Sequence, residues 1–246
     1  MLGAKRKVRI ETERLTLRLP MHSDFRAWSA LRRDSEAFLK PWEPTWAADH
    51  LSRKAFTNRV YWAQRSVANG TAMPLFIFQR ADDALVGAIT LDHIKRGPAQ
   101  SGITGYWMGE HFARKGFMRE AIEAVVHHAF TALDLSRIEA GCLPENTPSR
   151  RLLEQCGYKY EGVAQSYLQI NGRWRNHVLY ANLRALGGSF SAEHGVGAKR
   201  IAALVATSDP VKLATMMRIK QALDPDQTLN PGKVQPSQPL AREKFQ

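Results

Sequence analysis

The sequence predicts an α/β (α+β) protein built on a mixed central sheet, and three patterns support this prediction. Apolar and polar residues alternate over residues 13–19, which is typical of a strand with one buried face. Residues 119–133 carry apolar side chains on one helical stripe. Asn171-Gly172, between alternating residues, is the strongest short signal for a β-hairpin.

The other elements follow from similar signals. Phe25, Trp28 and Leu31 recur at helical spacing, and Gly157 is a suitable helix C-cap. In order, we expect a strand at 13–19, helices from 25 and at 51–67, a hairpin at 75–78 and 85–91, a strand at 102–108, a helix at 119–133, a strand at 137–143, a helix at 148–156 and strands at 158–163 and 167–181. Two tryptophans in the proline-containing loop 39–46 either wall a pocket or plug the core edge.

The amino-acid composition of the chain changes after Leu186. Four glycines lie within residues 187–197, a capped helix is expected over residues 210–223, and the end is rich in proline and polar residues. We therefore expect a domain at 9–184 and a helical and irregular tail at 185–246.

Composition narrows the class of protein and of partner. A chain of 246 residues with 44% hydrophobic residues can fill a core, and no run approaches the roughly 20 apolar residues that span a bilayer. The net charge of +12 favours an anionic partner, which leaves nucleic acid, a phosphorylated cofactor or an anionic membrane open. Two cysteines exclude a disulfide framework, and the basic start lacks an apolar segment, so the cytoplasm is the expected compartment.

A basic, glycine-containing turn at residues 113–118 lies between the strand at 102–108 and the helix at 119–133. A helix start offers unpaired N–H groups and a partial positive charge, and such a turn favours phosphate oxygens. The spacing matches neither the Walker A loop nor the dinucleotide-binding fingerprint.

Downstream, residues 144–158 read Pro-Glu-Asn-Thr-Pro-Ser-Arg-Arg-Leu-Leu-Glu-Gln-Cys-Gly-Tyr. Together with the turn at 113–118, this stretch resembles the GNAT superfamily of acetyl-CoA-dependent N-acetyltransferases. Glu161-Gly162 and residues 167–180 are similar to its RimJ/RimL branch, the ribosomal-protein N-terminal acetyltransferases. The resemblance covers residues 9–184 and departs from the family at Ala113 and Met118.

The resemblance implies a GNAT fold with helices on both sheet faces and a bulged strand before the CoA turn. The main chain of Met108 and Gly109 would then face the pantetheine and thioester, and Asn146 would contact the cofactor arm, with a helix N-cap as its ordinary role. Five residues would hold the pyrophosphate through backbone N–H groups: Arg114, Lys115, Gly116, Phe117 and Met118.

Two catalytic residues are suggested by the same comparison. Ser149 would protonate the departing thiolate, with a capping-turn hydroxyl as the alternative. Glu161 would be the base, against a structural ion pair with an arginine such as Arg173 or Arg175. Glu139, Glu110 and a water relay stay open, because an α-amine with a pKa near 8 needs little help to lose its proton.

The resemblance thus implies transfer of an acetyl group from acetyl-CoA to an amine, foremost the N-terminal α-amine of a protein and plausibly a ribosomal one. The alternatives are a GNAT-fold module that binds ribosomes or RNA with little or no turnover, and acetylation of a small amine. We expect no metal, since no ligands stand at zinc spacing, no membrane partner, and a monomer or homodimer.

The tail resembles another family. Residues 187–234 are similar to the C-terminal end of FAD-linked oxidases of the D-lactate dehydrogenase and glycolate oxidase type, in which the residue at His194 would lie near the flavin or substrate. The large flavin-binding part of those proteins is not in this sequence, so FAD is not expected, and a gene-fusion remnant is the preferred interpretation.

Overall fold

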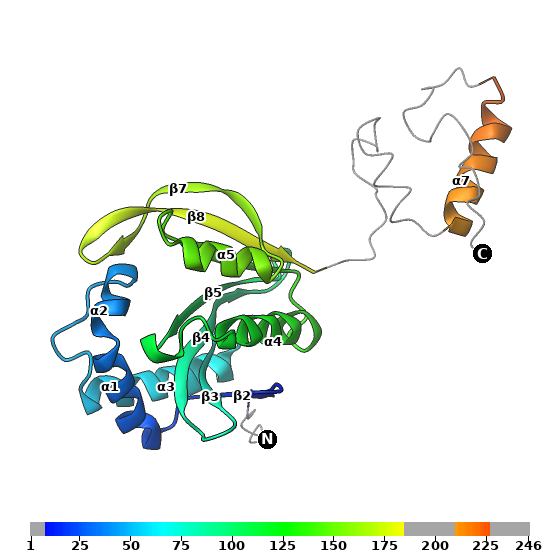
Figure 1. The fold of residues 1–246 in the computed structure, drawn as a ribbon. Coiled ribbons are helices and arrows are strands. Elements are labelled where there is room, and N and C mark those ends of the chain that lie inside the picture. Colours follow the sequence, from blue (N-terminus) through cyan, green and yellow to red (C-terminus); the bar gives the residue numbers. More distant parts are fainter. Residues whose placement is uncertain (1–7, 185–209, 227–246) are drawn as a thin grey trace. The chain divides into compact units, whose positions relative to one another are not determined.

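The computed structural model describes residues 8–184 and 210–226. The chain divides into two compact units, Met1–Arg184 and Ala185–Gln246 (Figure 1). Within the second unit, helix α7 (Pro210–Leu223) has the bounds that the capping residues predict.

The first unit is built on an eight-stranded mixed sheet in the order β1-β2-β3-β4-β5-β6-β8-β7. All neighbouring pairs are antiparallel except β5 and β6, which are parallel. The strands are β1 (Arg9–Glu11), β2 (Leu15–Arg18), β3 (Met73–Gln79), β4 (Leu85–Lys95), β5 (Ser101–Met108), β6 (Arg137–Cys142), β7 (Lys159–Ile170) and β8 (Arg173–Leu183).

Helices connect the strands. Their bounds are η1 (His22–Asp24), α1 (Phe25–Asp34), α2 (Glu36–Leu39), η2 (Lys40–Trp42), α3 (Arg53–Asn69), η3 (Glu110–Phe112), α4 (Phe117–Thr131) and α5 (Thr147–Gln155). The NG turn between β7 and β8 is confirmed, with Asn171 and Gly172 both at positive φ, as a tight hairpin requires.

Both faces of the sheet are covered, as the alternation along β3 shows. Leu75 and Ile77 pack in a buried cluster with residues of α4, such as Ile122. Phe76 points the other way, into a second cluster with residues of α1 and α3, such as Trp28. Each fully buried side chain of this size contributes about 1.5–3 kcal/mol to folding. The predicted α/β fold with helices on both faces is confirmed.

The sheet opens between its two parallel strands. β5 pairs with β6 only from Ser101↔Arg137 to Ile103↔Glu139, and beyond that point β5 pairs with β4 alone. β6 meanwhile continues along β8 as far as Cys142. The residues of β5 from Thr104 to Met108 therefore have no strand neighbour on one side.

The expected bulge lies elsewhere than predicted. β5 keeps one continuous register with β4 from Ile103 to Met108, so the strand before the turn is regular. The register shifts fall at the two ends of β4, near Leu85 and between Asp92 and Lys95. The opening arises because β5 and β6 diverge. A bulge in β4, which is the other neighbour of β5, can accommodate this divergence.

Candidate active site

The turn before α4 presents a set of backbone N–H groups. Arg114 and Gly116 have positive φ values of 61° and 82°, and Gly116 is the N-cap of α4. The Gly116 carbonyl accepts the N–H of Glu120 at 3.1 Å, which is the first turn of the helix. The N–H groups of Phe117 and Met118 precede that turn and have no acceptor inside the helix. This arrangement suits an anion such as a pyrophosphate.

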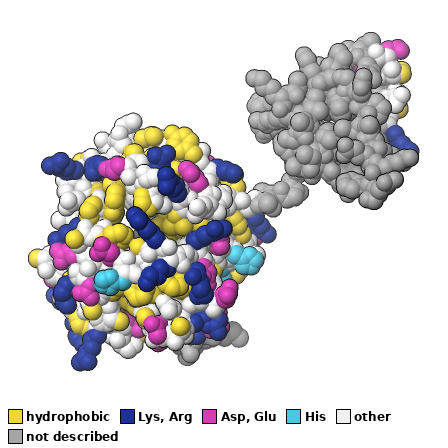
Figure 2. All heavy atoms as spheres, in the orientation of Figure 1, with side chains coloured by type: hydrophobic (Ala, Val, Ile, Leu, Met, Phe, Trp, Pro, Cys, Tyr) yellow, Lys and Arg dark blue, Asp and Glu magenta, His cyan; other side chains and the backbone are white. Residues whose placement is uncertain are grey.

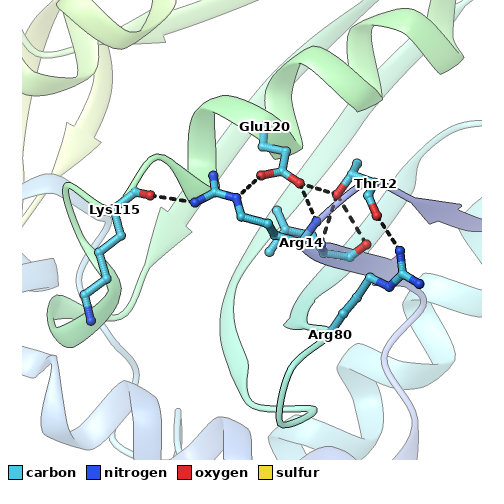
Figure 3. A network of polar contacts seen from close by, with 6 residues as sticks. Thr12, Arg14, Arg80, Lys115 and Glu120 are labelled. Carbon is cyan, nitrogen blue, oxygen red and sulfur yellow. Dashed lines mark hydrogen bonds and ion pairs between the residues drawn. The ribbon is translucent and has the colours of Figure 1, made fainter.

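The turn is held in place by residues of the loop between β1 and β2 (Figure 3). The Arg14 guanidinium donates to the Lys115 carbonyl at 3.1 Å and to Glu120 Oε2 at 2.7 Å. Thr12 and the Arg14 backbone N–H donate to Glu120 Oε1 at 2.6 and 2.9 Å. Burial acts to raise the pKa of Glu120, but these hydrogen bonds outweigh it and the pKa is lowered. The carboxylate is thus a fixed anchor for the turn.

Gly109 ends β5 where the chain leaves the sheet. Its N–H donates to the Val86 carbonyl at 2.9 Å, and its own carbonyl accepts the Phe112 N–H at 3.0 Å. A Cβ at Gly109 would lie 2.3 Å from Leu31 Cδ1, so a larger residue there requires the Leu31 side chain to move. Only the second lone pair of its carbonyl is left for a ligand. Met108, beside it, is half-buried against the first cluster.

The start of α5 lies across the opening from β5. Asn146 caps the helix, its Oδ1 accepting the Ser149 N–H at 3.1 Å, so the amide NH2 group is left for another partner. The Ser149 hydroxyl lies 2.8 Å from the Tyr106 hydroxyl of β5. Burial raises the pKa of Tyr106, so its phenol stays protonated. The sequence alone does not predict a role for Tyr106, because no local motif marks it.

A pocket of about 660 Å³ lies on the other face of the sheet from this hydroxyl pair, because the Tyr106 side chain packs against the first cluster, on the α4 face. Tyr106 lines it, and so do Phe76 and Ala88, which belong to the second cluster, so the pocket lies on the face of the sheet that carries α1 and α3. Its volume falls within the range of small-molecule sites. An acceptor entering there can meet a cofactor that enters from the α4 face through the opening.

Glu161 and Glu139 line the pocket, but Arg137 holds both. Its Nη1 and Nη2 donate to the two oxygens of Glu161, and its Nε donates to Glu139 at 2.7 Å. The Arg137 guanidinium holds the pKa of Glu161 below its ordinary value. Glu161 is therefore an ionised, ion-paired carboxylate, which makes it a weak base.

The ion pair itself was anticipated, but the suggested partners were wrong. Arg175 pairs with Glu145 instead of Glu161, and Arg137 on β6 takes the place that Arg173 or Arg175 was expected to fill. Glu110, the third candidate base, starts η3 and is not among the residues that line the pocket.

Cys142 and Cys156 are free and buried. Burial raises the pKa of the Cys142 thiol, against a hydrogen bond with Ser149, so the thiol is neutral at physiological pH. Across residues 8–184 and 210–226, no three His, Cys, Asp or Glu side chains gather as metal ligands. Nor does any helix in those ranges have the length and apolar character to cross a membrane.

Comparison with known proteins agrees with this geometry. The family model described as an acetyltransferase (GNAT) domain matches residues 14–159. The ribosomal protein uS5-alanine N-acetyltransferase of Escherichia coli is 31% identical over 175 residues, which cover 71% of this chain and 90% of that protein. A probable N-acetyltransferase of Bacillus subtilis is 34% identical and covers 62% and 84%.

Solved structures show the same likeness. Mycobacterium smegmatis RimJ in complex with CoA-disulfide matches with a TM-score of 0.68 at 30% identity, covering 73% of this chain and 88% of that one. The ribosomal-protein-S5-alanine acetyltransferase from Vibrio fischeri has a TM-score of 0.68 at 27% identity, covering 72% and 97%.

The C-terminal part matches a second model, that of the C-terminal domain of FAD linked oxidases, over residues 157–234. This match begins at residue 157 rather than 187, so it includes β7 and β8 of the sheet. An uncharacterized FAD-linked oxidoreductase of Mycobacterium tuberculosis is 46% identical over 83 residues, which make up only 18% of that protein.

Proposed function

The chain belongs to the GNAT acetyltransferase family and is an acetyl-CoA-dependent N-acetyltransferase, and from this premise we propose that its acceptor is the N-terminal α-amine of a protein, foremost a ribosomal protein. The observation that carries the proposal is the opening between β5 and β6, which has the Tyr106–Ser149 hydroxyl pair on the α4 face of the sheet and a pocket of about 660 Å³ on the α1 and α3 face. The names of the relatives from Escherichia coli and Vibrio fischeri, which specify a ribosomal-protein alanine, support the acceptor class.

We assign the cofactor to the opening between β5 and β6. The N–H groups of residues 114–118 would bind its pyrophosphate, with the side chains of Arg114 and Lys115 adding attraction. The pantetheine arm would take the unpaired side of β5 near Met108 and Gly109, within reach of the free amide group of Asn146. Its thioester would then face the hydroxyl of Ser149.

The chemistry is an acyl transfer in which the amine nitrogen attacks the thioester carbonyl. A C–N bond forms, the C–S bond breaks, and the sulfur leaves as a thiolate. Ser149 would donate its proton to that sulfur, and the Tyr106 phenol, hydrogen-bonded to Ser149, would replace the proton. The attacking amine releases its proton to water, and a proton taken from water restores the Tyr106 phenol.

No strong base is needed for such an acceptor. An α-amine has a pKa of about 7.7–8.0, so a usable fraction is neutral at cytoplasmic pH, unlike a lysine side chain at about 10.4. Both pocket glutamates, Glu139 and Glu161, are held by Arg137. A water-relayed loss of the amine proton is therefore the preferred route.

The charge distribution is compatible with acceptors bound to RNA. Residues after 184 carry eight Lys and Arg against five Asp and Glu, so +9 of the +12 belongs to residues 1–184. On the face shown in Figure 2, the basic side chains are spread among acidic ones rather than gathered in one patch. The excess suits CoA phosphates first, and ribosome association in the cytoplasm remains part of the proposal.

The test is an acetylation assay with the full chain, labelled acetyl-CoA and short peptides that begin with Ala, Ser or Met and contain one internal lysine. Mass spectrometry of fragments locates the acetyl group. We expect it on the α-amine, and none on the same peptides with a blocked N-terminus. Transfer only to lysine or to small amines such as spermidine would contradict the proposal.

A further inference from the structure

Arg59 on α3 is an arginine of the acceptor pocket that forms no direct ion pair with any described residue, although the charge of Glu43 acts on it from a distance. It lines the pocket beside Trp62, also of α3. Within the part of the chain that the structure describes, no carboxylate forms an ion pair with it, although the pocket's other arginine, Arg137, holds two. The guanidinium of Arg59 therefore has unused hydrogen-bond donors in the pocket.

The surroundings of Arg59 carry an excess of positive charge. The neighbouring Arg32 is buried and pairs with Glu43 through two hydrogen bonds of 2.7 and 2.5 Å. Burial, with the charge of Arg32 and Arg59, lowers the pKa of His50 to about 4, so that ring is neutral. Two guanidiniums thus share one carboxylate, Glu43.

The exposed surface of Arg59 lines a concave wall, where protein atoms displace part of its water. This desolvation, together with the charge of Arg32, lowers the pKa of Arg59. A partly desolvated cation that forms no direct ion pair, beside a second cation, attracts an anion more strongly than an arginine on an open surface does.

Arg59 and the two ion-paired glutamates lie on different sides of the pocket, and a third carboxylate, Asp92 of β4, also lines it and contacts His93. α3 packs on β3, whereas Glu139 and Glu161 belong to β6 and β7, with β4 and β5 lying between. Neighbouring strands are about 4.8 Å apart, so the β5–β6 opening lies roughly 10–14 Å from the β3 side. An extended peptide advances about 3.3 Å per residue, so three to four residues cover that span.

We propose that Arg59 is a specificity-determining residue that binds the carboxylate of an acidic side chain at the third or fourth residue of the acceptor peptide. The inference rests on the proposed function and narrows its substrate class. A free amino acid offers the same carboxylate, but its amine and carboxylate are too close together to reach both the opening and Arg59.

The experiment compares kcat/KM for matched hexapeptides that begin with Ala and carry one glutamate as the fourth residue, the same position as glutamine, or the glutamate as the sixth residue. For the unmodified chain we expect the first peptide to exceed the other two by on the order of tenfold. Arg59→Gln should reduce that preference to about twofold or less, and Arg59→Glu should instead favour a peptide with lysine as its fourth residue. Arg65→Gln, on the exposed surface of the same helix, is the matched control and should keep the preference.

Circular dichroism and thermal stabilisation by CoA show whether each variant is folded. Equal rates for the glutamate and glutamine peptides, or a preference that survives Arg59→Gln, would overturn the assignment of Arg59 and leave α-amine acetylation standing. An effect of Arg59→Gln confined to free amino acids would also overturn it. If the unmodified chain binds CoA but acetylates no peptide, the proposed function itself has failed, and the assignment of Arg59 fails with it.

Discussion

The Ser149 hydroxyl oxygen lies 2.8 Å from the Tyr106 hydroxyl oxygen, although 43 residues separate the two in the chain. One comes from the first turn of α5 and the other from β5, so the pair joins the two sides of the opening in the sheet. Burial keeps the Tyr106 phenol protonated, so Tyr106 can act as a hydrogen-bond donor to the Ser149 hydroxyl. This pairing accounts for how a serine could return a proton to a leaving thiolate.

The first prediction concerns this pair. Ser149→Ala should lower kcat about 100-fold and Tyr106→Phe about tenfold, because general acids contribute roughly 10²–10⁴-fold. The double variant should be no slower than Ser149→Ala, since Tyr106 acts through Ser149. Steady-state kinetics measure this, with the Kd for CoA as the control that should stay unchanged. Additive losses would separate the two hydroxyls.

A second prediction concerns the phosphate turn. Gly116→Asp should abolish the rise in Tm on adding CoA, because the new side chain brings negative charge to the N–H groups and a positive φ of 82° strains it. Gly70→Asp, at φ 67° with nothing near its Cβ, suffers similar strain at the end of α3. Thermal shift should show CoA stabilisation for Gly70→Asp but not for Gly116→Asp, and equal stabilisation would remove the turn from the site.

Much of the fold was readable from the sequence because its signals are local. The period-two alternation of β2, the amphipathic stripe of α4 and the Asn171-Gly172 turn each lie within a few residues. Some observed helix ends differ from the expected ones. The helix α4 begins at Phe117, two residues before the expected start, because Gly116 is its N-cap.

The site was less readable because its contacts are distant in sequence. Tyr106 meets Ser149 only when α5 packs beside β5, and Glu161 meets Arg137 only through the order β6-β8-β7. The expected partners of Glu161, Arg173 and Arg175, were therefore wrong, because only the fold brings Arg137 beside it. The opening between β5 and β6 could not be located from periodicity, since pairing partners leave no mark on a strand's own pattern.

A third prediction addresses the base. Glu161→Gln should change kcat/KM by less than about threefold, because Arg137 already holds this carboxylate and a surface ion pair contributes roughly 0–1 kcal/mol. Glu145→Gln, which loosens the comparable pair with Arg175, is the control. The rate should rise with pH up to about 8, following deprotonation of the acceptor α-amine. A loss of 100-fold or more in Glu161→Gln alone would reinstate it as the base.

A fourth prediction concerns the anchor of the turn. Glu120→Gln should lower the free energy of unfolding by about 2 kcal/mol at pH 7, since it weakens hydrogen bonds to a charged group. Because the folded pKa of Glu120 is lowered, this stability is present above the unfolded pKa of about 4.3 and is lost as pH falls through the folded value.

Urea denaturation between pH 3 and 7 tests this sign. The difference between the unmodified chain and Glu120→Gln should shrink toward acid pH, whereas Glu123→Gln, which breaks an exposed pair with Arg119, should cost only about 0.3–0.5 kcal/mol. A gap that widens in acid would show that Glu120 is not held as an anion.

The fifth prediction concerns the two units. Both buried clusters consist of residues between Leu15 and Tyr180. Deleting residues 185–246 should therefore leave a folded acetyltransferase that binds CoA with unchanged Kd. Isothermal titration calorimetry and circular dichroism check this, and a truncated chain that fails to fold would place the C-terminal unit in the core.

The central claim is that the cofactor enters between β5 and β6 and brings its sulfur to the Ser149–Tyr106 pair. A crystal structure of the full chain with CoA tests it most directly. The account predicts the pyrophosphate on the N–H groups of residues 114–118 and the sulfur within hydrogen-bond distance of the Ser149 hydroxyl. Cofactor bound outside the opening, or a sulfur remote from Ser149, would contradict it.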